Sequence, residues 1–259
     1  MTVPLLEVSD LAVRFGEHQA VRGISFTMGR ERVGIVGESG SGKSLTGRAI
    51  LRLLPRGARL TATCLAFAGI DLLAAGAEEM RALRGRRLAL VLQDPKFSLN
   101  PLMPVGPQIA EAYRAHGRLS VREARERMLA MLEAVRIREP RGVHDLYPHE
   151  ISGGMGQRVM IAMMLAGDPD LLIADEPTSA LDVTVQGQVL AVLDEQVSRR
   201  NMGLILISHD LDLVARFCDR VLVMERGVIV EGLAAAALDE AQHPYTRRLL
   251  AVRPRLALP

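Results

Sequence analysis

Residues 37–44 read GESGSGKS, and this stretch matches the pattern G-x-x-x-x-G-K-S/T of a phosphate-binding loop. The strand-like run RVGIVG leads into it and the helical run SLTGRAILRLL follows, which is the context that such a loop needs. Three glycines let the backbone bend so that successive amides point inward and form a nest for a phosphate at a helix N-terminus. These glycines are Gly37, Gly40 and Gly42. The stretch therefore predicts an α/β protein that binds a nucleoside triphosphate.

The side chains at the end of this loop have separate tasks. Lys43 would bring a positive charge to the outer phosphates, and the Ser44 hydroxyl would bind Mg²⁺. Lys43 is therefore expected to serve both binding and catalysis. We expect the nucleotide to contact the whole loop and the residue after it. These residues are Gly37, Glu38, Ser39, Gly40, Ser41, Gly42, Lys43, Ser44 and Leu45.

Two short apolar runs further along the chain end in polar residues. LLIADE (171–176) and LILISH (204–209) are typical of parallel strands that helices cover on both faces. Asp175 ends the first run, where a carboxylate is costly unless it serves a cation, so we expect it to hold Mg²⁺ opposite Ser44. Glu176 follows at the tip, where it could orient or deprotonate the attacking water. Together with the phosphate loop, these residues predict an enzyme that hydrolyses a nucleoside triphosphate.

Two further polar residues end predicted strands, and each has a plainer alternative. Gln93 ends the run LALVLQ and could touch both the metal and the attacking water, but a lone glutamine there is more often a surface residue. His209 ends the second apolar run, where a lone histidine is more often a satisfied core residue. Neither residue alone decides a function.

The chain changes character at residues 94–167, where helical periodicity replaces strand-like runs. Ser120 and Glu123 form a capping box at a helix start within this segment. The apolar residues behind it recur at helical spacing and predict one buried face. They are Val121, Ala124, Met128, Met131 or Leu132, and Val135. We interpret 94–167 as a helical subdomain inserted into a core formed by residues 1–93 and 168–259.

The remaining segments complete one domain over residues 1–259. Residues 5–35 carry β signals, VQGQVLAVLDEQVSR reads as a helix, RVLVMERGVIVEG as two strands around a turn, and HPYTRRLLAV as a short helix starting near Pro244. The predicted fold class is α/β. It combines a P-loop NTPase core with a parallel sheet and the inserted helical subdomain.

The composition narrows the classes of function. The 259 residues are 49% hydrophobic and 24% charged, which suits one globular domain with a subdomain. A net charge of +2 creates no strong electrostatic field that would drive nucleic-acid binding. Aromatic residues make up only 3% of the chain and include no tryptophan, which is too few for a surface on which bases could stack. The N-terminus does not resemble a signal peptide, and no run reaches the roughly 18 apolar residues of a membrane span. Cys64 and Cys218 lack metal-ligand spacing and are expected to be small buried residues.

The stretch ISGGMGQR (151–158) resembles a second anion site. Ser152 can cap a helix, while Gly153 and Gly154 expose their amides. The phosphate loop already encloses one triphosphate, so a second cradle is redundant within one subunit. We therefore expect it to bind the nucleotide of another copy. Gly156 lies inside the helix that follows and costs about 1 kcal/mol relative to alanine.

Seven motifs stand in order along essentially the whole chain: Phe15, GESGSGKS, Gln93, ISGGMGQR, LLIADEP, SALD (179–182) and His209. This ordered set closely resembles the nucleotide-binding subunit of an ABC transporter. The resemblance implies an ABC ATPase fold with an N-terminal antiparallel β-subdomain. It also implies that two subunits stack head to tail and sandwich two ATP molecules. Ser152, Gly153 and Gly154 would then bind the γ-phosphate across the interface, and Asp182 would connect the two sites.

The same resemblance implies roles within one subunit. Phe15 would stack on the adenine, although by itself it would be assigned to the core. Gln93 would sense the nucleotide and its metal beside the groove for the membrane partner. His209 would contact the γ-phosphate and position the water that Glu176 activates. ATP and Mg²⁺ are the implied cofactors.

A narrower resemblance joins the chain to the oligopeptide, dipeptide and nickel importer subfamily. It is carried by QDPKFSLNPLMPVGPQI, SGGM, DEPTSALDVTVQ and HPYTRRLL, with Gly156 where an arginine is usual. The implied partners are integral membrane permease subunits, a second ATPase subunit that is identical or a sister, and indirectly an extracytoplasmic solute-binding protein. The implied location is the cytoplasmic face of the membrane, without nucleic acid. The cargo, peptide or nickel chelate, stays open, as does the alternative of an ABC-type ATPase in DNA repair or regulation.

Overall fold

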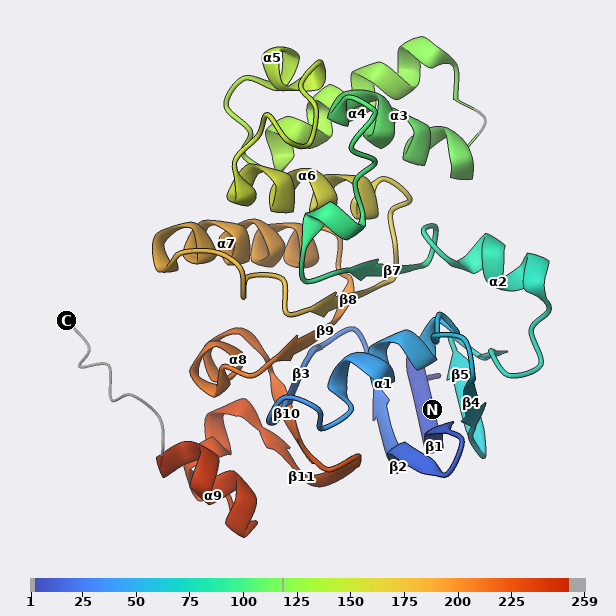
Figure 1. The fold of residues 1–259 in the computed structure, drawn as a ribbon, viewed down its shortest axis with the longest axis vertical. Coiled ribbons are helices and arrows are strands. Elements are labelled where there is room, and N and C mark those ends of the chain that lie inside the picture. Colours follow the sequence, from blue (N-terminus) through green and yellow to red (C-terminus); the bar gives the residue numbers. More distant parts are fainter. Residues whose placement is uncertain (1–2, 118, 252–259) are drawn as a thin grey trace. The chain divides into compact units, whose positions relative to one another are not determined.

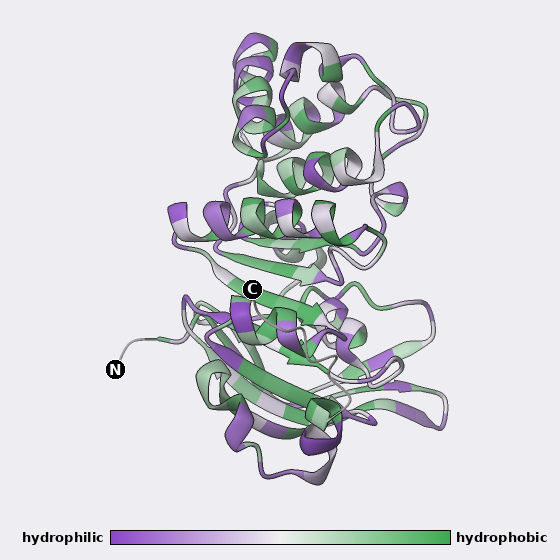
Figure 2. Ribbon diagram, turned by 90° about the vertical axis from the view of Figure 1, so that its left-hand side faces the viewer, coloured by the Kyte–Doolittle hydropathy of each residue, from purple (hydrophilic) through white to green (hydrophobic). Residues whose placement is uncertain are grey.

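The computed structural model describes residues 3–117 and 119–251 and shows two compact units (Figure 1). The first unit consists of Met1–Gly76 and Gly203–Pro259, and the second of Ala77–Met202. The predicted helical subdomain, 94–167, lies within the second unit. In Figure 2 the strands near mid-height are mostly hydrophobic, whereas the helices carry both hydrophobic and hydrophilic residues. This pattern is expected for strands that are covered on both faces.

An antiparallel sheet forms the N-terminal part of the first unit. Its strands are β1 (Leu6–Phe15), β2 (His18–Met28), β4 (Ala58–Thr61), β5 (Cys64–Phe67) and β6 (Ile70–Asp71). β1 pairs antiparallel with β2, β4 and β5. Buried and exposed residues alternate along much of β2, which is the pattern of a strand with one covered face. The predicted antiparallel β-subdomain is confirmed.

Within the described residues, the rest of the first unit consists of three parallel strands, one antiparallel strand and the helices beside them. The parallel strands are β3 (Arg32–Val36), β9 (Gly203–Ser208) and β10 (Arg220–Glu225), and β11 (Val228–Ala234) adds antiparallel to β10. Every residue of β9 is buried, as the continuous apolar run predicts. The helices of this unit are α1 (Lys43–Ile50), α8 (Leu211–Phe217), η2 (Ala235–Glu240) and α9 (Pro244–Ala251). The helix predicted from the run SLTGRAILRLL therefore ends at Ile50, before the last residues of that run.

The second unit combines two parallel strands with most of the helices. β7 (Leu88–Val91) pairs parallel with β8 (Leu171–Asp175). Helices precede and follow these strands: α2 (Ala77–Leu83), η1 (Pro95–Phe97), α3 (Val105–His116), α4 (Val121–Ala134), α5 (Pro140–His144), α6 (Gly153–Leu165) and α7 (Val183–Arg199). β7 ends at Val91, so Gln93 follows the strand and does not terminate it, contrary to the prediction.

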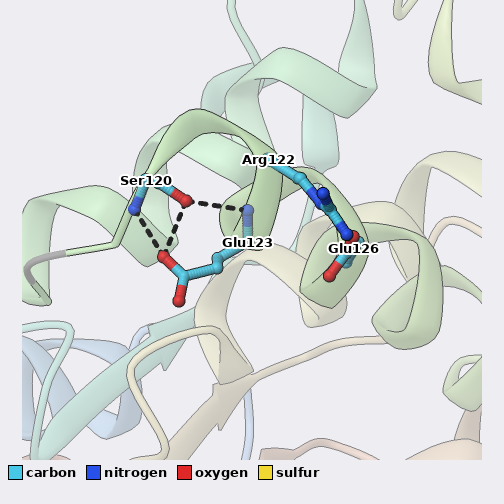
Figure 3. A network of polar contacts seen from close by, with 4 residues as sticks. All are labelled: Ser120, Arg122, Glu123 and Glu126. Carbon is cyan, nitrogen blue, oxygen red and sulfur yellow. Dashed lines mark hydrogen bonds and ion pairs between the residues drawn. The ribbon is translucent and has the colours of Figure 1, made fainter.

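The capping box at the start of α4 is confirmed (Figure 3). The Ser120 hydroxyl accepts a hydrogen bond from the Glu123 amide at 3.2 Å, and the Ser120 amide donates to the Glu123 carboxylate at 2.8 Å. Hydrogen bonds from Ser120 lower the pKa of Glu123. The expected buried face is correct from Ala124 onward but wrong for Val121, which is 70% exposed. Val121 is the first residue of the helix, and its side chain is not covered there.

The two cysteines differ in burial. Cys218 is buried, and desolvation raises its pKa to about 12, so its thiol behaves as the small apolar group that the sequence predicts. Cys64 is only half-buried, because it begins the short strand β5, so the same expectation is wrong for it. Both cysteines carry free thiols and form no disulfide within the described residues.

Two glycines of α6 are expected to respond oppositely to alanine. A Cβ at Gly156 would lie 3.4 Å from Pro95 Cγ and 3.8 Å from Ile151 Cδ1, which are ordinary contacts. Gly156→Ala should therefore raise the free energy of unfolding by about 0.5–1 kcal/mol, because alanine restricts the unfolded chain. A Cβ at Gly154 would lie 2.2 Å from Val185 Cγ1.

Gly154→Ala is the matched control, and overpacking should destabilise it by about 1–3 kcal/mol. Urea unfolding followed by circular dichroism measures both variants. A Gly156→Ala variant less stable than the wild type would show that the glycine is required for the helix to pack.

Candidate functional site

The phosphate loop joins the end of β3 to the start of α1 in the first unit. Gly42 is the N-cap of α1 with φ 100°, and Gly37 has φ 155°. A Cβ at Gly37 would lie 2.0 Å from the Met224 carbonyl oxygen, and one at Gly42 would lie 2.8 Å from the Ala20 carbonyl oxygen. Both positions therefore require glycine, for the backbone conformation and for the close approach of neighbouring strands. The loop predicted from the sequence is built as expected.

Lys43 lies buried within this loop. Only 5% of the residue is exposed, and its ammonium donates to the carbonyl oxygens of Gly37 at 2.7 Å and of Glu38 at 2.9 Å. A buried cation needs such partners, because desolvation without them is costly. The charge is thereby held against the loop backbone, where phosphate oxygens are stronger acceptors than carbonyls.

Other groups of the loop fit an anion. Gly42 provides no side-chain cap for α1, and no acidic residue stands in the first turn of that helix. The first amides of a helix lack intrahelical acceptors and carry the positive end of the helix dipole. The Ser41 hydroxyl oxygen is buried, and it has no hydrogen-bond partner among the residues that the structure describes. A phosphate would satisfy groups of this kind, so the residues present fit a nucleotide.

His209 follows the neighbouring strand at the same edge of the sheet. Val36, which precedes the loop, lies opposite Ser208 in the parallel pair β3–β9. His209 is exposed, so the plainer alternative of a satisfied core histidine does not apply to it. The adjacent Asp210 caps α8 by accepting a hydrogen bond from the Leu213 amide at 3.0 Å, so a helix begins directly after this strand end. The phosphate loop and His209 are therefore brought to one edge.

Phe15 lies elsewhere in the first unit. It ends β1 and lies opposite His18 of β2 and Ala58 of β4. It is half-buried, so the ring is neither a full core residue nor fully exposed. Its place at a turn leaves part of the ring accessible to a ligand.

Three predicted residues of the second unit also share one sheet edge. Val91 lies opposite Ala174 in the parallel pair β7–β8. Asp175 is the last residue of β8, and Gln93 and Glu176 follow the same ends of the two adjacent strands. Asp175 is 5% exposed, whereas Gln93 is exposed. A carboxylate, a second carboxylate and an amide are oxygen ligands of the kind that Mg²⁺ accepts.

Glu176 has a feature that the sequence did not reveal. Its φ is 48°, in the left-handed region that residues with a side chain seldom adopt. Such strain costs on the order of 1 kcal/mol and is concentrated at functional sites. The Ser179 amide and hydroxyl donate to the Glu176 carbonyl at 3.3 and 3.2 Å, which stabilises this turn. The backbone at Glu176 therefore departs from the extended conformation of the strand that precedes it.

The starts of α6 and α7 form a second group in this unit. The Ser152 hydroxyl accepts a hydrogen bond from the Met155 amide at 3.4 Å, and Asp182 accepts one from the Val185 amide at 3.0 Å. The two helix starts are adjacent, since a Cβ at Gly154 would strike Val185. Ser152, Gly153 and Asp182 are exposed. ISGGMGQR and SALD, which the sequence separates, therefore present one surface.

Gln157 makes a contact that the sequence did not predict. It is 1% exposed, and its side-chain amide donates to the Leu92 carbonyl at 3.5 Å. Leu92 directly precedes Gln93, so this hydrogen bond connects α6 to the segment that carries Gln93. A buried glutamine in an apolar helix is the signal that could have identified it.

Within residues 3–117 and 119–251, no helix has the length and apolar character needed to span a membrane.

Comparisons with known proteins agree with this geometry. A family model described as ABC transporter matches residues 21–179. A putative peptide import ATP-binding protein of Brucella abortus is 48% identical, over 98% of this chain and 79% of that protein. The oligopeptide transport ATP-binding protein OppD of Bacillus subtilis is 46% identical, over 97% of this chain and 72% of its own length.

Solved structures extend the similarity to the fold. A dimeric ATP-binding cassette in a post-hydrolysis state, bound to ADP and Pi, is 25% identical with a TM-score of 0.77, and the match covers 89% of this chain and 98% of that one. The cbiO1 subunit of Clostridium perfringens, part of an ABC transporter complex, has a TM-score of 0.78 over 97% of this chain and 96% of its own. At 24% identity, this second match concerns the fold alone.

Proposed function

Because the chain belongs to the ABC transporter family, we propose that it is the ATPase subunit that powers import of a peptide through membrane permease subunits. The observation that carries the proposal is the built phosphate loop with its buried Lys43. This loop belongs to a chain that is 48% and 49% identical to two relatives named as peptide transport ATP-binding proteins, over 98% and 95% of its length. The fold is that of ABC ATPase cassettes, which supports the assignment of ATP hydrolysis to this chain.

The residues of one subunit divide the work on ATP. The amides of the loop and the Lys43 ammonium bind the phosphates, and Phe15 stacks on the adenine. Ser44, Gln93 and Asp175 would hold Mg²⁺, which neutralises charge on the phosphates. Glu176 accepts a proton from the attacking water, and His209 contacts the γ-phosphate and positions that water.

A second subunit completes each site. Ser152, Gly153 and Gly154 form the start of α6, where the N-cap Ser152 and Gly153 are exposed and Gly154 is buried. The start of a helix binds anions. In the proposed head-to-tail dimer this surface contacts the γ-phosphate held by the other subunit, and Asp182 beside it connects the two sites. The dimeric cassette that matches this chain supports such an arrangement.

The names of the relatives favour a peptide cargo over a nickel chelate, since they are described as peptide and oligopeptide transport proteins. We propose a peripheral location on the cytoplasmic face of the membrane, with an extracytoplasmic solute-binding protein delivering the cargo. The second ATPase is an identical copy or a sister subunit.

We propose that the permease binds at two exposed apolar side chains. Phe97 is 81% exposed and Leu102 is 87% exposed, and both follow Gln93 closely in the chain. Large exposed apolar groups in one segment are typical of a protein interface. The affinity-tagged chain, purified from detergent-solubilised membranes of its native cell, should therefore retain integral membrane subunits that mass spectrometry identifies as permeases.

Replacing Phe97 and Leu102 together by serine should reduce this retention at least about tenfold, since buried apolar anchors contribute about 1.5–3 kcal/mol each. The ATPase activity of the isolated chain should not change. Val121→Ser is the matched control, because Val121 is also exposed but begins a different helix. Retention of soluble proteins alone, by the wild type, would contradict a transport role.

A further inference from the structure

The C-terminal helix α9 contacts the phosphate loop through one side chain. Tyr245 is 3% exposed, and its hydroxyl accepts a hydrogen bond of 2.9 Å from the Glu38 amide. Glu38 is the second residue of the loop, more than two hundred residues earlier in the chain. The partner of Tyr245 is thus a backbone group of the loop itself, so the contact constrains the loop backbone.

Tyr245 is held rigidly enough to act on the loop. The Glu231 carboxylate of β11 accepts hydrogen bonds from the Gln242 amide at 2.7 Å and the His243 amide at 3.3 Å, just before α9 begins. The Arg248 guanidinium lies 5.6 Å from the centre of the Tyr245 ring and contacts Glu225 of β10 at 3.4 Å. The helix start and the ring are therefore both attached to the sheet.

A second contact holds the other part of the loop. The Gly227 amide, in the turn between β10 and β11, donates to the Ser41 carbonyl at 3.0 Å. The Tyr245 bond at Glu38 and the Gly227 bond at Ser41 bracket the residues between them. Gly40 lies within this interval and has φ 81°. Without restraints, a glycine would also populate many other backbone conformations. Two external contacts therefore restrict the segment that must cradle the phosphate.

We propose that Tyr245 is a positioning residue that pre-forms the phosphate loop for ATP. This inference rests on the proposed ATP-binding function of the loop. If only a fraction of molecules holds the binding-competent loop, the apparent dissociation constant rises by the inverse of that fraction. The hydroxyl of Tyr245 keeps that fraction high by holding the Glu38 amide in place. Once phosphate is bound, the ligand itself orders the loop, so the chemical step is unaffected.

Tyr245→Phe tests the inference because it removes the hydroxyl and keeps the ring. We expect the dissociation constant for ATP, measured with a fluorescent analogue on the monomer, to rise about three- to tenfold, as loss of one hydrogen bond implies. The kcat at saturating ATP should stay within about twofold of the wild-type value. Exchange of the Glu38 amide with deuterium should accelerate in the absence of nucleotide.

Tyr113→Phe is the matched control. It removes the same atom from a half-buried tyrosine of α3, in the second unit, and should change none of the three measurements. Unchanged ATP affinity of the folded Tyr245→Phe protein would overturn the proposal. So would a lower melting temperature or kcat without an affinity change, because this is the result of a purely structural anchor for α9.

The two levels of the proposal can fail separately. If Lys43→Ala abolishes ATP binding but Tyr245→Phe does not weaken it, the loop binds ATP and only the role of Tyr245 is wrong. If Lys43→Ala binds ATP as well as the wild type, the function assigned to the loop is itself wrong.

Discussion

Lys43→Ala is expected to abolish ATP hydrolysis and to weaken ATP binding by about a hundredfold or more. The Lys43 ammonium is the buried cation of the loop, and charge-assisted hydrogen bonds to phosphate contribute about 1.5–3 kcal/mol each. Alanine leaves the outer phosphates without that charge, while the amides of the loop remain. Equilibrium binding of a fluorescent ATP analogue and release of phosphate measure the two effects.

Lys96→Ala is the control for net charge. Lys96 is the second lysine of the sequence and is exposed, so its loss should alter neither binding nor hydrolysis in the isolated chain. The Lys43 ammonium also donates to two loop carbonyls, so circular dichroism must show that the Lys43→Ala variant is folded. A folded variant that hydrolyses ATP normally would refute the assignment of residues 37–44.

Glu176→Gln is expected to bind Mg-ATP with unchanged affinity but to hydrolyse it about 10²–10⁴ times more slowly. Glutamine keeps the size of the side chain and the strained backbone, but its amide cannot accept the proton of the attacking water. Since ATP then persists between the subunits, a closed dimer should accumulate. Phosphate release and light scattering in the presence of Mg-ATP measure hydrolysis and dimerisation.

Two variants sharpen this experiment. Glu111→Gln makes the same change at an exposed position of α3 and should leave both measurements unchanged. Adding Ser152→Ala to Glu176→Gln should remove the ATP-dependent dimer, because Ser152 would contact the γ-phosphate of the other subunit. The ATP affinity of the monomer should not change. Affinity lost in the monomer would place Ser152 in the same site as Lys43, and full hydrolysis by Glu176→Gln would exclude Glu176 as the base.

The amino-acid sequence determined the parts of this protein that depend on local pattern. The phosphate loop, the two buried strands β8 and β9, and the cap at Ser120 follow from glycine spacing, continuous apolar runs and short-range hydrogen bonds. The end of β9 at Ser208, one residue before the predicted end at His209, did not follow from these patterns. The ordered motifs also identified the family and the fold class, which the comparisons confirm. Local rules fail where packing decides exposure, as they did for Val121.

The tertiary structure alone decided which distant residues meet. The strand register placed His209 beside the end of β3, and packing of α6 on α7 joined Gly154 to Val185. No sequence pattern predicts the left-handed backbone at Glu176 or the hydrogen bond from the Glu38 amide to Tyr245. The physical reason is that such contacts join segments far apart in the chain. Their geometry depends on the folding of everything between them, whereas periodicity and spacing report only on neighbours.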